Sequence, residues 1–105
     1  MKTATITLPE PTINTLCPLS PGDKAYALDR LKRDMEAFVT AYTNCTGGSP
    51  YNCGETCQAH NTMRGSVWMA AYCNLIEGQS AFDITNAALI LMGRWHAERN
   101  ALPPS

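Results

Sequence analysis

The chain has 105 residues, of which 45% are hydrophobic and 16% are charged. This length allows one globular domain and no second, and the charged fraction lies below the roughly 25% that is usual in soluble proteins. Eight basic and nine acidic side chains give a net charge of −1, so the chain lacks the basic excess of a general nucleic-acid binder. The weakly polar surface that this composition implies favours a protein partner or self-association.

The first twenty residues contain one lysine, and threonines interrupt their apolar positions, so they lack the apolar core of a secretory signal. No apolar run approaches the ~20 residues that a membrane-spanning helix needs. We therefore expect a cytoplasmic protein with no membrane segment. Cysteines in the cytoplasm are usually reduced or metal-bound, and an odd total of five leaves at least one thiol without an intrachain partner.

The N-terminal segment alternates between apolar and threonine positions from Thr3 to Leu8, which is the period of a half-buried strand. Pro9 and Pro11 end the pattern. Because one short strand is not stable alone, residues 3–8 are expected either to lie on the domain as an extended arm or to pair with a second copy of the chain.

A first helix is predicted over residues 21–44. Ser20 is placed to cap it, Pro21 suits its first position, and Asp23 complements the exposed amides of its first turn. Apolar residues recur at alternating spacings of three and four, which gives one buried stripe; they are Leu28, Leu31, Met35, Phe38 and Tyr42. The opposite face offers ion pairs four residues apart, namely Asp29 with Arg33, Arg30 with Asp34 and Lys32 with Glu36.

A second helix is predicted over residues 55–78, with Gly78 ending it. Its apolar pattern is less regular: His60, Met63, Val67 and Ala70 share one face, while Trp68 and Ala71 lie on the next. Gly65 lies in the interior of this helix, where glycine costs about 1 kcal/mol relative to alanine. An interior glycine is usually tolerated where a neighbouring helix comes close or the helix axis bends, and the small residues Gly65, Ala70 and Ala71 favour close packing.

A third helix is predicted over residues 81–100, after a second Ser-x-x-Asp start at Ser80. It is the most hydrophobic of the three and is apolar on more than one face, as expected of a central helix or of one covered by another subunit. The prediction is an all-α protein, a small three-helix bundle with an extended N-terminal arm. The single domain spans 1–105, with the arm at 1–20, the helical core at 21–100 and a tail at 101–105.

The segment from Asn44 to His60 holds three of the five cysteines. Cys45, Cys53, Cys57 and His60 have ligand types and a spacing that could hold a structural zinc ion. The spacing lacks the C-x2-C pairs of ordinary zinc sites, so two alternatives stay open. One is a disulfide from Cys45 to Cys53 or Cys57, and the other is a set of reduced thiols that pack as small apolar side chains.

A catalytic role would require Cys57 as a nucleophile with His60 as its base. Two residues one turn apart on one helix leave little room for a third orienting group, and no phosphate-binding glycine motif is present. We therefore expect that the protein is not an enzyme. Cys73 and the aromatic residues Trp68, Tyr72, Phe82 and Trp95 are expected to lie in the core.

These observations predict a small helical binding protein, an adaptor or inhibitor of the kind that phages and mobile elements often encode. It would cover a surface of a macromolecular partner, most simply a protein, and the apolar third helix favours a homodimer. The alternative is a zinc- or redox-responsive module built on Cys45, Cys53, Cys57 and His60, in which the loop ties the first two helices together. No other cofactor is implied.

Overall fold

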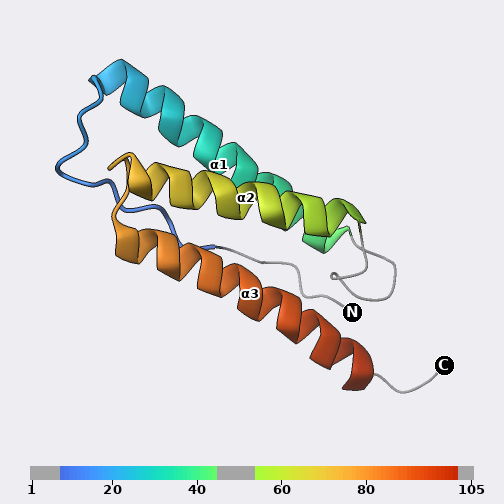
Figure 1. The fold of residues 1–105 in the computed structure, drawn as a ribbon. Helices are drawn as coiled ribbons and strands as arrows, with labels where there is room; N and C mark the ends of the chain where they lie inside the picture. The colour runs from blue at the N-terminus through green and yellow to red at the C-terminus, as the bar shows by residue number, and fades with distance from the viewer. Residues whose placement is uncertain (1–7, 45–53, 102–105) are drawn as a thin grey trace.

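The computed structural model describes the backbone of residues 8–44 and 54–101 and the side chains of residues 8–44 and 54–93. This part of the chain forms three helices, α1 (Pro21–Thr43), α2 (Gly54–Tyr72) and α3 (Gly78–Ala101). They run up, down and up beside one another, preceded by an arm without regular structure (Figure 1). The predicted all-α bundle with an extended N-terminal arm is confirmed.

The start of α1 follows the predicted capping pattern. Ser20 has extended backbone angles, and its Oγ accepts a hydrogen bond of 3.2 Å from the N–H of Asp23. Pro21 occupies the first turn, where its missing N–H would have no intrahelical partner. The predicted stripe on α1 is also confirmed, because Leu31, Met35, Phe38 and Tyr42 are buried and Leu28 is half-buried.

Two of the predicted charge pairs on α1 are replaced by contacts with other elements. Asp29 and Arg33 do form an ion pair, with 3.0 Å between the carboxylate and Nε. Lys32, however, pairs with Glu10 of the arm at 3.5 Å, and Asp34 accepts a hydrogen bond from the hydroxyl of Ser66 on α2. Lys32 therefore connects α1 to the arm, and Asp34 connects α1 to α2.

The end of α2 differs from the prediction, which was wrong in placing it at Gly78. Asn74 adopts a positive φ of 59°, and the helix stops in a Schellman arrangement: the N–H of Leu75 donates to the carbonyl of Ala70, and the N–H of Asn74 donates to that of Ala71. Apart from glycine, asparagine is one of the residues that adopt this left-handed conformation most readily. Gly78 instead begins α3.

The arm is held by backbone pairing at the turn between α2 and α3. Ile13 forms an antiparallel bridge with Ile76, flanked by hydrogen bonds from Asn14 N–H to the Leu75 carbonyl at 3.0 Å and from Glu77 N–H to the Thr12 carbonyl at 2.9 Å. The arm therefore pairs within its own chain at residues 12–14. The predicted strand at 3–8 lies outside the described residues except for Leu8, which has no regular structure.

Ser80 has a different role from the predicted cap of α3. Because α3 starts at Gly78, Ser80 lies within its first turn and is buried. Its Oγ accepts a hydrogen bond of 2.8 Å from the N–H of Thr12. The serine that resembled a cap therefore binds the arm.

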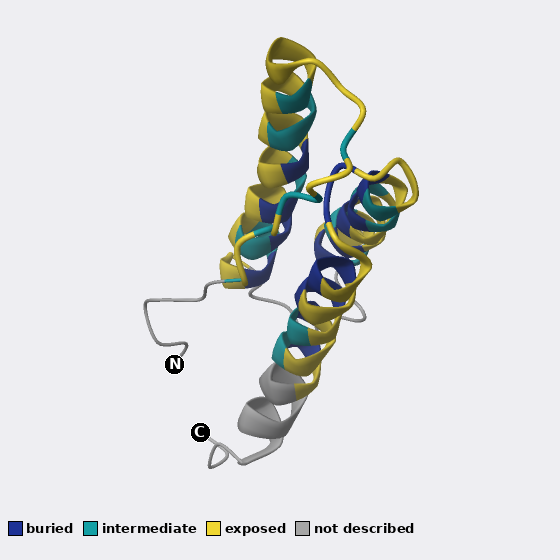
Figure 2. Ribbon diagram, turned by 90° about the vertical axis from the view of Figure 1, so that its left-hand side faces the viewer, coloured by how far each residue is buried: buried dark blue, intermediate teal, exposed yellow. Residues whose placement is uncertain are grey.

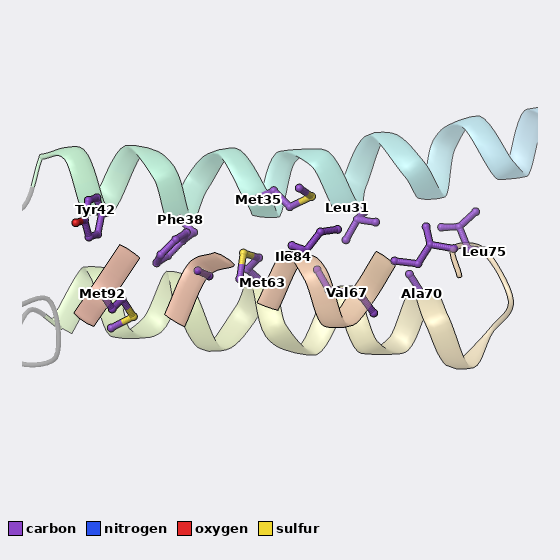
Figure 3. Packing of buried hydrophobic residues seen from close by; sticks show 13 residues of the cluster. Leu31, Met35, Phe38, Tyr42, Met63, Val67, Ala70, Leu75, Ile84 and Met92 are labelled. Carbon is purple, nitrogen blue, oxygen red and sulfur yellow. The ribbon is translucent and has the colours of Figure 1, made fainter. Parts of the chain in front are cut away.

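The core lies between the three helices, with α2 in contact with both others. Figure 3 shows Phe38 and Tyr42 pointing from α1 towards Met63 of α2 and Met92 of α3. The remaining buried apolar residues continue this layer to the α2–α3 turn; they are Leu31, Met35, Val67, Ala70, Leu75, Ile76, Ala81, Ile84 and Ala88. Thus α2, and not the more hydrophobic α3, is the central helix.

Candidate functional site

The predicted zinc constellation is only partly within the described residues. Cys45 and Cys53 lie outside them, so the four predicted ligands cannot be compared as a set. Cys57 and His60 lie one turn apart near the start of α2, with Cys57 half-buried and His60 buried. Among the residues that the structure describes, no cluster of three or more His, Cys, Asp or Glu side chains could hold a metal ion.

His60 lies in the core between α1 and α2. Its side chain is 6% exposed, and its ring packs against Phe38 with 5.4 Å between ring centres. The Nε2 atom is buried and has no hydrogen-bond partner in the described structure. Burial, with a smaller contribution from the nearby charge of Arg64, lowers the pKa of His60 below its ordinary value of 6.5. The imidazole is therefore neutral at neutral pH.

The first turn of α2 is fixed to the last turn of α1 beside this histidine. Thr56 is fully buried, and its hydroxyl donates a hydrogen bond of 3.2 Å to the carbonyl of Ala41. Across the core, the hydroxyl of Tyr42 donates to the carbonyl of Leu91 on α3 at 2.8 Å. The first of these hydrogen bonds joins α1 to α2, and the second joins α1 to α3.

The other cysteines occupy separate places. Cys17 is a half-buried thiol of the arm that packs against the core. Cys73 is an exposed thiol just after α2, so the prediction that it lies in the core was wrong. The left-handed turn at Asn74 ends α2 earlier than predicted and leaves Cys73 at the surface.

The predicted core position was also wrong for two of the four aromatic residues. Tyr72 is 78% exposed and Phe82 is 54% exposed. Trp68 is half-buried and packs against the ring of Tyr72, with ring centres 6.2 Å apart. The side chain of Trp95 lies outside the described part. Tyr72 and Phe82 therefore belong to a surface that the sequence did not predict.

Large apolar side chains are concentrated on the outer surfaces of α2 and α3. Figure 2 shows that both helices alternate between a buried inner side and an exposed outer side. The exposed large apolar residues of the described chain are Leu16, Leu19, Tyr26, Met69, Tyr72, Phe82, Leu89 and Ile90. Contiguous exposed apolar surface on a small soluble protein commonly marks a binding site, so their relative positions matter.

The side of α3 that carries Phe82 and Leu89 follows from its hydrogen bonds. Ser80 faces the arm, because its Oγ binds Thr12. Successive helical residues are about 100° apart, so Phe82 and Leu89 lie roughly 180–200° round α3 from Ser80. They therefore lie on the side of α3 away from the arm.

The same reasoning places Trp68 on α2. Ser66 faces α1, because its hydroxyl donates to Asp34, and Trp68 lies about 200° further round α2, on the side away from α1. Since a short turn joins the antiparallel helices, the last turn of α2 lies beside the start of α3 (Figure 1). We call Trp68 and Tyr72 of α2, together with Phe82 and Leu89 of α3, the seam surface.

A separate hollow of about 350 Å³ lies between the arm and α1. Leu8, Pro11, Met35 and Val39 give it apolar walls, while the ion pair of Glu10 and Lys32 borders its opening together with Glu36 and Thr40. Among the residues that the structure describes, neither a cysteine nor a histidine lines it.

The described residues form a small all-α protein with large exposed apolar side chains on α2 and α3. No helix within residues 8–44 and 54–101 has the length and apolar character needed to cross a membrane. Comparison of the chain with protein-family models, with curated proteins and with solved structures gives no match.

Proposed function

We propose that this protein is a small helical binding protein, an adaptor or inhibitor that acts in the cytoplasm by covering a surface of a partner protein. The observation that carries the proposal is the seam surface, where Tyr72, Phe82 and Leu89 expose between 47% and 78% of their area. Aromatic residues that can be buried at the centre of an interface contribute most of its binding energy.

The shape of the site favours a helical segment of the partner. Two antiparallel helices with apolar side chains on either side of their groove form a track that can accept the apolar face of a third helix. Phe82 and Leu89 are seven residues apart, about 10 Å along α3, which matches two turns of such a helix. Binding would require no nucleophile, metal ion or cofactor of this chain.

The test starts from capture of partners with the wild-type protein in an extract of its native host, and each captured protein is then purified and titrated against variants. Phe82→Asp places a charge in the middle of the seam surface and should weaken binding at least tenfold. Tyr26→Asp is the matched control, because Tyr26 is 66% exposed on α1, which contributes no residue to the seam surface. A partner that binds both variants as tightly as the wild type would contradict the proposal.

A second candidate function is the zinc- or redox-responsive module, which the unpartnered buried Nε2 of His60 favours. A metal-dependent fold should lose many degrees of melting temperature when the metal is removed by a chelator, and a disulfide-dependent fold should respond in the same way to a reductant. The binding protein of the first proposal should melt at nearly the same temperature in both reagents.

A further inference from the structure

The hollow between the arm and α1 has the size of a small-molecule site. Its volume of about 350 Å³ lies at the lower end of the roughly 300–1,000 Å³ of typical ligand pockets. Its residues come from two separate segments, the arm at 8–11 and the middle of α1 at 32–40. No residue of the seam surface lines it, so the hollow is separate from the surface on which the proposed function rests.

The inner part of the hollow is apolar. Met35 and Val39 are one helical turn apart on α1 and form one wall, and Leu8 and Pro11 of the arm form the other. Met35 is buried and the other three residues are half-buried, so apolar surface remains there for a ligand to cover. This interior can accept a short hydrocarbon chain or a single ring, whose removal from water favours binding.

The border of the hollow is polar and negatively charged. Lys32, Glu36 and Thr40 follow one another at intervals of four along α1 and so form a row at one-turn spacing. Lys32, at one end of this row, is paired with Glu10 of the arm at 3.5 Å. Within the described part of the chain, Glu36 has no ion-pair partner. Two carboxylates and one ammonium therefore leave an excess of negative charge at the border.

We propose that the hollow binds a small amphipathic amine, with its ammonium group at Glu36 and its apolar part between α1 and the arm. The ammonium group would donate hydrogen bonds to the carboxylate of Glu36 and to the hydroxyl of Thr40, which can accept one. An anion would instead meet the unpaired carboxylate of Glu36, while Lys32 is already held by Glu10. Charge complementarity therefore favours a cation over an anion.

Binding at this place would also connect the arm to α1. The side chains of Lys32 and Glu10, which pair across the hollow, are 48% and 85% exposed, and an exposed pair of this kind contributes little to stability. A ligand that packs against Leu8 and Val39 at once would hold the arm more firmly. Amide hydrogen exchange at Thr12, which follows Pro11 in the arm, should therefore become slower when the amine is bound.

The test is a titration of the full chain with three probes of similar size and different charge, followed by the amide NMR signals. The probes are 2-phenylethylamine, 2-phenylethanol and 3-phenylpropionate. The amine should shift the signals of Glu10, Val39 and Thr40 with a dissociation constant in the low millimolar range or below, as expected of about nine non-hydrogen atoms. The alcohol should bind about fivefold more weakly or less, and the propionate should give no saturable shift. Added salt should weaken the binding of the amine only.

Two substitutions separate the charge from the apolar contact. Glu36→Gln keeps the shape of an exposed side chain and should weaken binding of the amine about fivefold while leaving the alcohol unchanged. Glu77→Gln is the matched control, because Glu77 is exposed outside the hollow and its replacement changes the net charge equally. Val39→Thr replaces a methyl group of the wall with a hydroxyl and should weaken the amine and the alcohol alike. Circular dichroism of each variant confirms the fold.

Three outcomes would each overturn the proposal of an amine site. They are the absence of shifts at Glu10, Val39 and Thr40 up to ~20 mM amine, equal binding of the amine and the propionate, and equal affinity of Glu36→Gln and Glu77→Gln for the amine. Phe82→Asp should bind the amine like the wild type, because Phe82 does not line the hollow. Failure of the amine site would therefore leave the proposed function of the seam surface unaffected, and the reverse also holds.

Discussion

The Oγ of Ser80 accepts a hydrogen bond from the backbone N–H of Thr12 at 2.8 Å, across 68 positions of the chain. It joins the arm to the first turn of α3 next to the antiparallel bridge between Ile13 and Ile76. The same serine is buried within the bundle. A single hydroxyl therefore couples the arm to the turn that orients α2 against α3.

Replacing Ser80 with alanine should lower the free energy of unfolding by about 1 kcal/mol, because the N–H of Thr12 loses its partner. Amide hydrogen exchange should become faster at Thr12. The N–H of Asn14, which binds the carbonyl of Leu75, serves as the reference within the arm. Unchanged exchange at Thr12 would show that Ser80 does not hold the arm.

Asn74 should be replaceable by glycine but not by alanine. Its φ of 59° is a conformation that costs a residue with a Cβ about 1 kcal/mol or more, and asparagine reduces this cost only in part. Asn74→Gly should leave the melting temperature unchanged or raise it, whereas Asn74→Ala should lower the free energy of unfolding by about 1 kcal/mol. Equal stability of the two variants would argue against a left-handed residue at this position.

Gly65→Ala should stabilise the protein by about 0.5–1 kcal/mol, because alanine restricts the unfolded chain and favours the helix. The predicted close packing at Gly65 was wrong: the residue is exposed, and an added Cβ would meet no atom within 4 Å. Ala70→Gly is the comparison. Ala70 is buried on the same helix, so its replacement by glycine should lower the free energy of unfolding. Urea unfolding of both variants measures the difference.

His60 should make the stability fall as the pH drops below about 6.5. The lowered pKa keeps the folded imidazole neutral, whereas in the unfolded chain it binds a proton near its ordinary pKa. The contribution of His60 to the free energy of unfolding is therefore fully present above pH 6.5. It decreases as the pH falls from 6.5 to the lower pKa of the folded state. Urea unfolding between about pH 7.5 and pH 5, where most carboxylates stay ionised, measures this slope.

His60→Leu, which keeps a similar volume beside Phe38, should reduce that slope. The comparison with the wild type removes the contribution of His96, which both proteins share. An equal slope in the two proteins would mean that His60 is already protonated or is solvated in the folded state.

The regular part of the fold follows from local patterns in the sequence. The stripe from Leu31 to Tyr42 predicts the buried face of α1, and Ser20 with Pro21 predicts its start, because both depend on interactions within one helix. By contrast, the end of α2 depends on Asn74 adopting a positive φ, and asparagine does so in only some of its positions. Gly78 was the stronger sequence signal and was misleading.

The candidate site could be predicted much less well. Whether Phe82 and Tyr72 are buried or exposed depends on which side of each helix faces its neighbours. The hydrophobicity of α3 alone does not distinguish its inner side from its outer side. The positions of Phe82 and Leu89 are visible in the sequence, but only the packed structure shows that their side chains are exposed. Long-range contacts of this kind have no local sequence signature.

The central claim is that partners bind at the seam surface, and hydroxyl-radical footprinting tests it most directly. The protein would be labelled at low micromolar concentration, in buffer and with its purified partner. Tyr72 and Phe82 should lose reactivity in the complex, while Tyr26, which is 66% exposed on α1, should keep it. Protection of Tyr26 with full labelling of Tyr72 and Phe82 would contradict the claim.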